Sequence, residues 1–239
     1  MKFSGWMIVL AAAGAACAPA AAPGPASPEP APGAGQPSAP APSEQDMLRI
    51  AQELRRATVP ASPRQVNFGW VLDEAGARFS GRGVARFQAP RRSRLDLFGP
   101  RGETYLSAAL VDGEARVPPA LMGRFALPSP ALLWGAVGVL EPPAEARLLE
   151  AATRGGETTL RYQAGEDVLE FRAEGARLQS VRRRRGSAVA ESIDLSWNDQ
   201  GVSRAQYRDW AAYRTLNLTI ESSTDVEQFP EDTWRPAGT

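Results

Sequence analysis

The feature that most constrains the fold is a long succession of short segments, from about residue 66 to residue 220, in which apolar and polar residues alternate. Such alternation places apolar side chains on one face of a β-strand. Turn signals at 154–156, 164–167 and 198–201 separate several of the segments. Short strands at close spacing are typical of an antiparallel meander and argue against strand–helix–strand units. We predict about eleven strands, centred on 66–72, 79–87, 95–97, 106–110, 148 and its neighbours, 158–163, 168–172, 178–184, 189–197, 203–209 and 216–220.

One segment, residues 127–143 (LPSPALLWGAVGVLEPP), departs from this pattern and is called the plug segment below. Ser129 is a favourable N-cap, Pro130 suits the first helical position, and no charged side chain follows until Glu141. A short helix that is apolar on every side must be buried all round or face lipid. A barrel of about eleven strands leaves space that its own side chains do not fill. The plug segment therefore predicts a short apolar plug or lid helix over a cavity.

The walls of this cavity are predicted from the apolar faces of the strands and from the plug segment. Large apolar side chains contribute roughly 1.5–3 kcal/mol each when they leave water, so these residues should face inward. We predict that the cavity is lined by Phe68, Trp70, Leu97, Leu106, Leu133, Trp134, Val137 and Leu140.

A helix is predicted before the first strand. Ser43 and Asp46 have the spacing of a capping box, with Asp46 in the position usually taken by Glu or Gln. Apolar residues then recur at helical spacing until a proline ends the segment, at Met47, Ile50, Ala51, Leu54 and Pro60. The predicted fold class is therefore α+β, with a curved antiparallel sheet around an apolar cavity.

The first 16 residues have the pattern of a secretory signal peptide. Lys2 precedes an apolar run at 6–13, which is too short to span a bilayer core of about 30 Å. The single cysteine, Cys17, directly follows small residues and resembles the lipobox of bacterial lipoproteins, although Gly14 stands where that motif usually has leucine. The resemblance implies that Cys17 is lipidated. The alternative is ordinary signal-peptidase cleavage nearby.

Residues 17–42 are rich in Pro, Ala, Gly and Ser and contain no aromatic residue. Such a stretch cannot bury a core and behaves as a semi-extended spacer. We expect a signal peptide at 1–16, a lipidated N-terminus and Pro/Ala-rich tether at 17–42, and a folded domain at 43–239. Because Ala18 is not aspartate, the sorting rule that accompanies the lipobox implies the periplasmic face of the outer membrane.

The composition restricts the chemistry that this chain can perform. With 27 basic and 27 acidic residues, it has no bulk attraction for nucleic acid. With no histidine and one cysteine, it lacks the usual proton shuttle, thiol–imidazole pairs and His/Cys zinc sets. We therefore expect no catalytic residues, no metal and no cofactor.

The order of these elements resembles the LolA/LolB superfamily of periplasmic lipoprotein carriers and acceptors, and most closely LolB-like outer-membrane lipoproteins. The resemblance rests on the N-terminal helix, the bending strands, RLDLFGPRGETYLSAAL (94–110), LPSPALLWGAVG (127–138) and FPEDTW (229–234). It spans roughly residues 43–239. It implies an unclosed β-barrel covered by helices, whose hydrophobic cavity accepts the acyl chains of lipoproteins.

The resemblance also assigns a role to the hairpin turn formed by Gly99, Pro100, Arg101 and Gly102. In LolB-like proteins this loop protrudes and carries a leucine that helps deliver the lipoprotein into the membrane; here that position is Arg101. Arginine costs about 2.5–3.5 kcal/mol at the bilayer centre, where leucine is mildly favourable. At headgroup depth Arg101 would instead pair with a lipid phosphate, and a solvated turn residue is the alternative.

Three functions are weighed on these grounds. The first is an outer-membrane-anchored, monomeric acceptor that takes an acylated lipoprotein or lipid into its cavity, with a soluble periplasmic carrier as a further partner. The second is a non-catalytic scaffold that uses a filled half-barrel to bind an envelope partner. The third is a hydrolase, which the missing histidine and the lack of a nucleophile motif make the least favoured.

Overall fold

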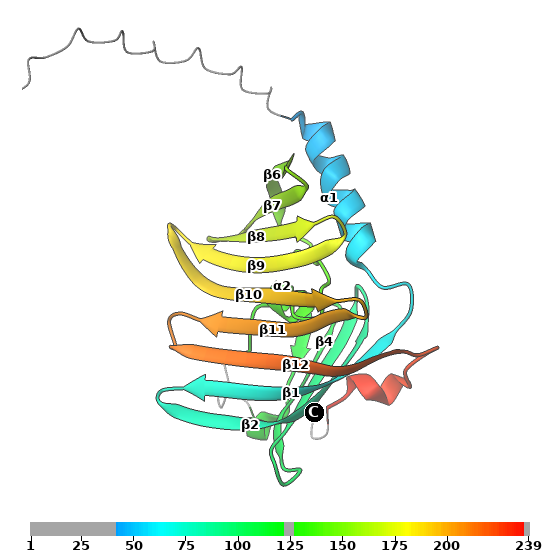
Figure 1. The fold of residues 1–239 in the computed structure, drawn as a ribbon, viewed down its shortest axis with the longest axis vertical. Coiled ribbons are helices and arrows are strands. Elements are labelled where there is room, and N and C mark those ends of the chain that lie inside the picture. The colour runs from blue at the N-terminus through cyan, green and yellow to red at the C-terminus, as the bar shows by residue number, and fades with distance from the viewer. Residues whose placement is uncertain (1–41, 122–126, 237–239) are drawn as a thin grey trace, which may run out of the picture. The chain divides into compact units, whose positions relative to one another are not determined.

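The computed structural model describes residues 42–121 and 127–236 (Figure 1). The predicted signal peptide and the tether up to residue 41, including Cys17, lie outside the described residues. Within the described ranges, no helix is both long and apolar enough to cross a membrane.

All twelve strands of the described residues form one antiparallel sheet, in the order β5-β4-β3-β2-β1-β12-β11-β10-β9-β8-β7-β6. The first meander runs through β1 (Arg64–Glu74), β2 (Ala77–Gln88), β3 (Arg92–Phe98), β4 (Thr104–Val111) and β5 (Glu114–Arg116). The second runs through β6 (Arg147–Arg154), β7 (Glu157–Ala164), β8 (Asp167–Glu174), β9 (Arg177–Arg185), β10 (Ala188–Asn198), β11 (Gly201–Asp209) and β12 (Arg214–Asp225). Pairing of β1 with β12 joins the two meanders and leaves the barrel open between β5 and β6.

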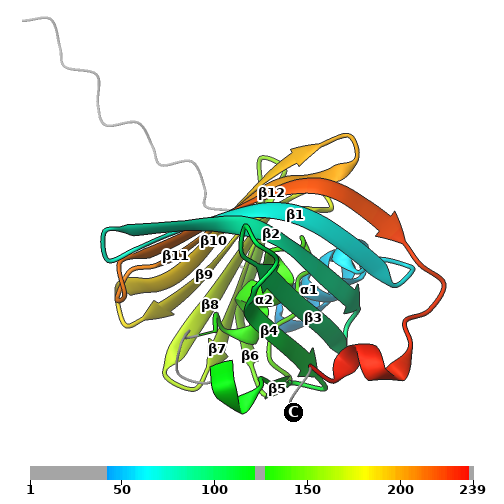
Figure 2. The same ribbon diagram turned by 90° about the horizontal axis from the view of Figure 1, so that it is seen from below.

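The connection between the two open edges contains η1 (Pro119–Leu121) and α2 (Pro130–Gly135), and it returns to the sheet at β6. Figure 2 shows α2 inside the curve of the sheet. The helix α1 (Glu44–Thr58) packs against β6. A last short helix, η2 (Glu231–Trp234), follows β12 and packs against the outer faces of β3 and β4.

The two ends of α1 agree with the sequence prediction. The Ser43 hydroxyl accepts a hydrogen bond from the backbone N–H of Asp46 at 3.2 Å and donates one to the Asp46 carboxylate at 2.7 Å. The Asp46 carboxylate thus accepts a hydrogen bond from the Ser43 hydroxyl. In a regular capping box, the longer glutamate side chain instead accepts from the backbone N–H of the N-cap residue. The helix ends at Thr58, shortly before Pro60.

The plug segment connects two halves of the core. One cluster of buried residues joins α1 to strands β6–β11 and includes Ala131, Leu132 and Leu140. The other lies on strands β1–β4 and includes Trp134 and Val139. Because the plug residues divide between the clusters, the connection holds the two meanders together across the opening.

The expected unclosed antiparallel barrel with an N-terminal helix and a plug helix is confirmed, with two differences. A twelfth strand, β5, was not predicted because its three residues are too few for alternation to register. The plug helix is also shorter than the apolar run, because it stops at Gly135 and the chain turns through Gly138 at a φ of 82°. Ser129 occupies the N-cap position, but its hydroxyl makes no hydrogen bond within the described residues.

Candidate functional site

A cavity of about 170 Å³ lies between α2 and the inner faces of the sheet. Its walls come from β1–β5, from the plug segment and from β10–β12. Nearly all of the lining side chains are aliphatic or aromatic, as the alternating pattern of these strands requires. The interior therefore contains apolar space that the side chains of the chain do not fill.

The structure brings five of the eight predicted lining residues together at this cavity. Two come from opposite strands of one hairpin, because Leu97 on β3 is paired with Leu106 on β4. Phe68 reaches the cavity from β1, and Leu133 and Val137 reach it from the plug segment.

Trp70 is buried but does not line the cavity. Its indole N–H donates to the backbone oxygen of Arg82 at 3.0 Å, and its ring centroid is 5.2 Å from that of Tyr105. The tryptophan thus packs within the β1–β2–β4 region, and Tyr105 reaches the cavity wall instead.

Trp134 and Leu140 are likewise buried away from the cavity wall. The ring of Trp134 meets Phe87 edge to face, with centroids 6.4 Å apart. Leu140 belongs to the cluster around α1, and its backbone N–H donates to the Thr58 hydroxyl at 3.1 Å. The apolar character of the plug segment indicated burial correctly but carried no information about which of its faces meets empty space.

Sequence reasoning missed the part of the wall that the second meander supplies. These residues alternate along β10–β12, and the period-two pattern at 216–220 was the available signal. They were not assigned because only the pairing of β12 with β1 brings them to the cavity. The main ones are Ile193, Ala205, Tyr207, Leu216, Leu218 and Ile220.

A second pocket of about 320 Å³ adjoins the first. It lies between the C-terminal end of α1, the turn at 136–138 and strands β10–β12, and both pockets are lined by Ala136 and Val137. An apolar cavity of about 150 Å³ is large enough to hold benzene. The first cavity alone therefore fits a short hydrocarbon segment, and a longer chain would need both volumes, which share Val66, Phe87, Ala136, Val137 and Ile220 as lining residues.

A band of polar side chains lies at the end of the cavity-lining strands where β12 begins and β1 ends. Tyr207 lines the cavity and donates from its hydroxyl to Glu191 at 2.6 Å. Glu191 also accepts from Arg183 at 2.5 Å. Arg214, on the cavity wall, forms an ion pair with Glu74. These contacts connect neighbouring strands and pair the charges with one another.

Hydrogen bonds in and beside this band hold Tyr207 protonated and Asp167 ionised near neutral pH. Burial and the hydrogen bond to the Glu191 carboxylate raise the pKa of Tyr207 far above its usual range, so the phenol stays protonated. Asp167 accepts from Arg185 at 2.9 Å and from Arg183 at 2.8 Å, and these bonds hold the pKa of its carboxyl below the usual range. No group of three or more His, Cys, Asp or Glu residues within 42–121 and 127–236 is arranged to hold a metal ion.

The turn formed by Gly99, Pro100, Arg101 and Gly102 joins β3 to β4 at the foot of the molecule in Figure 1. The N–H of Gly102 donates to the Gly99 oxygen at 3.0 Å, and the N–H of Arg101 donates to the Glu103 carboxylate at 2.9 Å. Pro100, Arg101 and Gly102 are exposed. The Arg101 guanidinium has no ion-pair partner among the described residues, so its charge is presented to the surroundings.

These features define a class of protein: a half-open antiparallel barrel whose plug segment covers an apolar cavity. No model of a known protein family matches the sequence, and a search of curated proteins finds no match.

Solved structures place this architecture among known folds. A LolA superfamily protein from Nitrosomonas europaea is similar at 11% identity, over 79% of this chain and 96% of that one, with a TM-score of 0.54. A DUF1329 family protein from Desulfovibrio piger is similar at 7% identity, over 80% and 96%, with a TM-score of 0.47. The MucA/MucB complex of Pseudomonas aeruginosa gives 12% identity, over 80% and 60%, with a TM-score of 0.33. The chain has the LolA-like fold, as predicted from the sequence.

Proposed function

We propose that this chain is a non-enzymatic acceptor of acylated lipoproteins or lipids, anchored through Cys17 at the periplasmic face of the outer membrane. The observation that supports it best is the cavity of about 170 Å³, which is apolar and lies beneath a plug that is itself apolar. Transfer of hydrocarbon into such a site is favourable by roughly 0.8 kcal/mol for each CH₂ buried. An acyl chain is the ligand whose chemistry matches these walls.

The geometry also suggests the course of the chain. A bound tail would start in the pocket near the C-terminal end of α1, pass Val137 and end in the inner cavity. The polar band, with its paired charges, would form the closed end. The LolB-like assignment remains part of this proposal, with a soluble periplasmic carrier as the source of the client.

Filling the cavity should remove binding without harming the fold. Ala108 on β4 is buried and lines the cavity, so Ala108→Leu places additional methyl and methylene groups in the empty space. We expect this variant to lose at least about tenfold in affinity for a fluorescent fatty acid, while its thermal midpoint stays equal or rises, because cavity filling is commonly stabilising. Ala77→Leu adds the same atoms at an exposed position of β2 and is the matched control.

The full chain, purified without detergent, is compared by fluorescence titration and by native mass spectrometry. Lipid adducts on the parent and on Ala77→Leu, but not on Ala108→Leu, would support the acceptor function. A parent chain with no adducts and no uptake would contradict it. Co-purification of an envelope protein with that empty parent would favour the scaffold.

The turn between β3 and β4 makes a second prediction about delivery. Replacing Arg101 with leucine should raise the transfer of an acylated lipoprotein into liposomes, by up to about a hundredfold where the tip enters hydrocarbon, because the difference between the two side chains there is around 3 kcal/mol. Removal of the client from a soluble carrier should not change. Arg154→Leu, at an exposed turn on the opposite end of the strands, is the control.

Two results decide between the steps of this mechanism. If the client leaves the carrier but enters liposomes only after Arg101 is replaced, the turn limits delivery. If neither variant takes the client from the carrier, the acceptor role is wrong, whatever the turn does.

A further inference from the structure

The turn between β11 and β12 consists of four consecutive exposed residues without charge, Trp210-Ala211-Ala212-Tyr213. The side chains of Trp210 and Tyr213 are among the most exposed large apolar groups of the described residues, at 52% and 87%. Hairpin turns usually carry Asn, Asp, Gly or Pro. A run of exposed apolar residues of this length is unfavourable in water unless it serves a function.

The turn is held in place by specific contacts. The carboxylate of Asp209 accepts from the N–H groups of Ala211 and Ala212, both at 3.0 Å. The N–H of Trp210 donates to the Ala190 oxygen at 3.0 Å. The chain therefore fixes the turn while leaving its aromatic rings outside the core.

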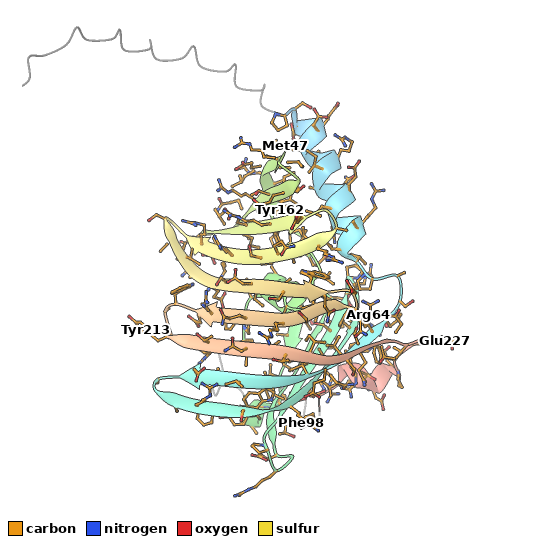
Figure 3. The ribbon with its side chains drawn as sticks, in the orientation of Figure 1. Met47, Arg64, Phe98, Tyr162, Tyr213 and Glu227 are labelled. Carbon is orange, nitrogen blue, oxygen red and sulfur yellow. The ribbon has the colours of Figure 1, made fainter. Side chains whose placement is uncertain are left out.

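Tyr213 adopts a backbone conformation that is unfavourable for its residue type. Its φ of 50° lies in the left-handed region, where glycine is the usual residue. In Figure 3 the Tyr213 side chain projects from the end of β12, away from the sheet. Ala75 and Asp112 have the same conformation in two other hairpin turns, so the positive φ belongs to the turn geometry. A large aromatic side chain at such a position, 87% exposed, is the feature that points to binding.

The chemistry of the turn fits the interface of a lipid bilayer. Tryptophan and tyrosine are enriched at membrane interfaces because each has an apolar body and one polar group. The guanidinium of Arg208 lies 5.9 Å from the centroid of the Trp210 ring. It also pairs with Asp194 at 3.6 Å, but both side chains are partly exposed, so a lipid phosphate can compete for the arginine. A protein interface buries about 800 Å² on each partner, which four residues do not supply, whereas a bilayer needs no complementary shape.

Two further observations bear on whether the Trp210–Tyr213 turn could reach a membrane: its place in the strand register and the length of the chain before the domain. Arg214, directly after the turn, pairs with Glu74 at the end of β1, and the turn therefore lies at the same end of the strands as the Gly99–Gly102 turn. At about 3.1 Å per residue, a semi-extended stretch of 26 residues, from 17 to 42, would reach roughly 80 Å.

We infer that the Trp210–Tyr213 turn docks on the phospholipid surface of the membrane to which the chain is anchored, by inserting its two aromatic rings at headgroup depth. This inference rests on the proposed membrane-anchored role but is independent of acyl binding in the cavity. The turn would give the domain a fixed orientation that a flexible tether alone does not provide.

The test compares variants of the full chain that all carry Cys17→Ser, so that no acyl anchor contributes and the N-terminus is the same in each. Co-sedimentation is measured with vesicles of phosphatidylcholine alone and of phosphatidylcholine mixed with phosphatidylglycerol. Trp210→Ser combined with Tyr213→Ser should lower vesicle binding at least about tenfold. Leu48→Ser, at another exposed apolar residue on α1, should leave it unchanged.

A further variant separates binding from folding. Tyr213→Gly relieves the positive φ, so it should raise the thermal midpoint by roughly 2–4 °C while still weakening vesicle binding. Equal vesicle binding by the parent and the double variant would overturn the inference. Unchanged vesicle binding together with loss of a co-purifying protein would also overturn it and assign the turn to a protein partner. Fatty-acid uptake is measured on the same samples, so a failure of the cavity proposal is seen separately.

Discussion

Replacing Gly81 with alanine is expected to destabilise the domain by at least about 3 kcal/mol. A Cβ atom at this position would lie 1.9 Å from the backbone oxygen of Phe98 and 2.9 Å from the ring of Trp70. The first neighbour is part of the β2–β3 ladder, so it can move only by breaking strand pairing. Overpacking typically costs about 1–3 kcal/mol when the surrounding core can adjust. Because the obstacle here is a backbone atom, we expect the cost to reach or exceed the upper end of this range.

Gly69 provides the matched control on the neighbouring strand β1. A Cβ atom at Gly69 would lie 3.5 Å from the end of the flexible Glu221 side chain, which is an ordinary contact. Because alanine also restricts the unfolded chain, Gly69→Ala should be neutral or stabilising by up to about 1 kcal/mol. Urea unfolding of both variants measures the difference. Equal midpoints for the two variants would show that β2 and β3 do not approach as closely as the structure has them.

The strand pattern predicted where these glycines lie but not why they are needed. Taken from the sequence alone, Gly81 and Gly83 on β2 indicate only that this strand can bend. In the structure they are cross-strand partners of Trp70 and Phe68, and a Cβ at Gly83 would lie 2.4 Å from the Phe68 ring. Alternation identifies strands and faces, whereas a cross-strand pair depends on register, which a single sequence does not reveal.

The same limit applies to the candidate cavity. A side-chain period of two distinguishes inward from outward positions, and all eight predicted residues except Leu133 and Val137 are buried. Which inward residues meet empty space depends on the volume that the plug segment leaves. That volume follows from the end of α2 at Gly135 and the turn at Gly138, which the continuous apolar run concealed.

The burial of charged side chains was likewise not evident from the alternating pattern. Glutamate on the outer face of a strand is ordinarily solvated, yet Glu170 on β8 is only 1% exposed. Its carboxylate accepts from Arg161 at 3.0 Å and from Arg172 at 2.9 Å. Both arginines are much more exposed than the carboxylate they cover. Replacing the arginines should therefore change the free energy of unfolding by a different amount than replacing Glu170.

Removing both positive charges is expected to destabilise the domain by about 3–5 kcal/mol, since it leaves a buried carboxylate unpaired. Arg161→Met with Arg172→Met keeps the side chains long enough to cover Glu170. Glu170→Gln should cost only about 1–2 kcal/mol, because the two arginines can turn to water. Adding Glu170→Met to the double variant should restore most of the lost stability, since replacing a whole buried ion cluster by apolar side chains is often close to neutral.

The pH dependence of the unfolding free energy has a definite sign, and it distinguishes loss of the ion pairs from a packing defect in the double variant. Burial opposes ionisation of Glu170, but the bonds from Arg161 and Arg172 outweigh it and hold the pKa below its usual range. The cluster therefore stabilises the parent above the ordinary glutamate pKa of about 4.3, and this contribution is lost as pH falls through the lower folded pKa. Without the arginines, burial raises the pKa of Glu170 instead, and protonation of the carboxylate relieves the variant.

The difference in unfolding free energy between parent and double variant should thus be largest near pH 7 and shrink towards pH 4. A difference that stays constant across this range in urea titrations would mean that the methionines disturb packing and that the buried charge is not the cause.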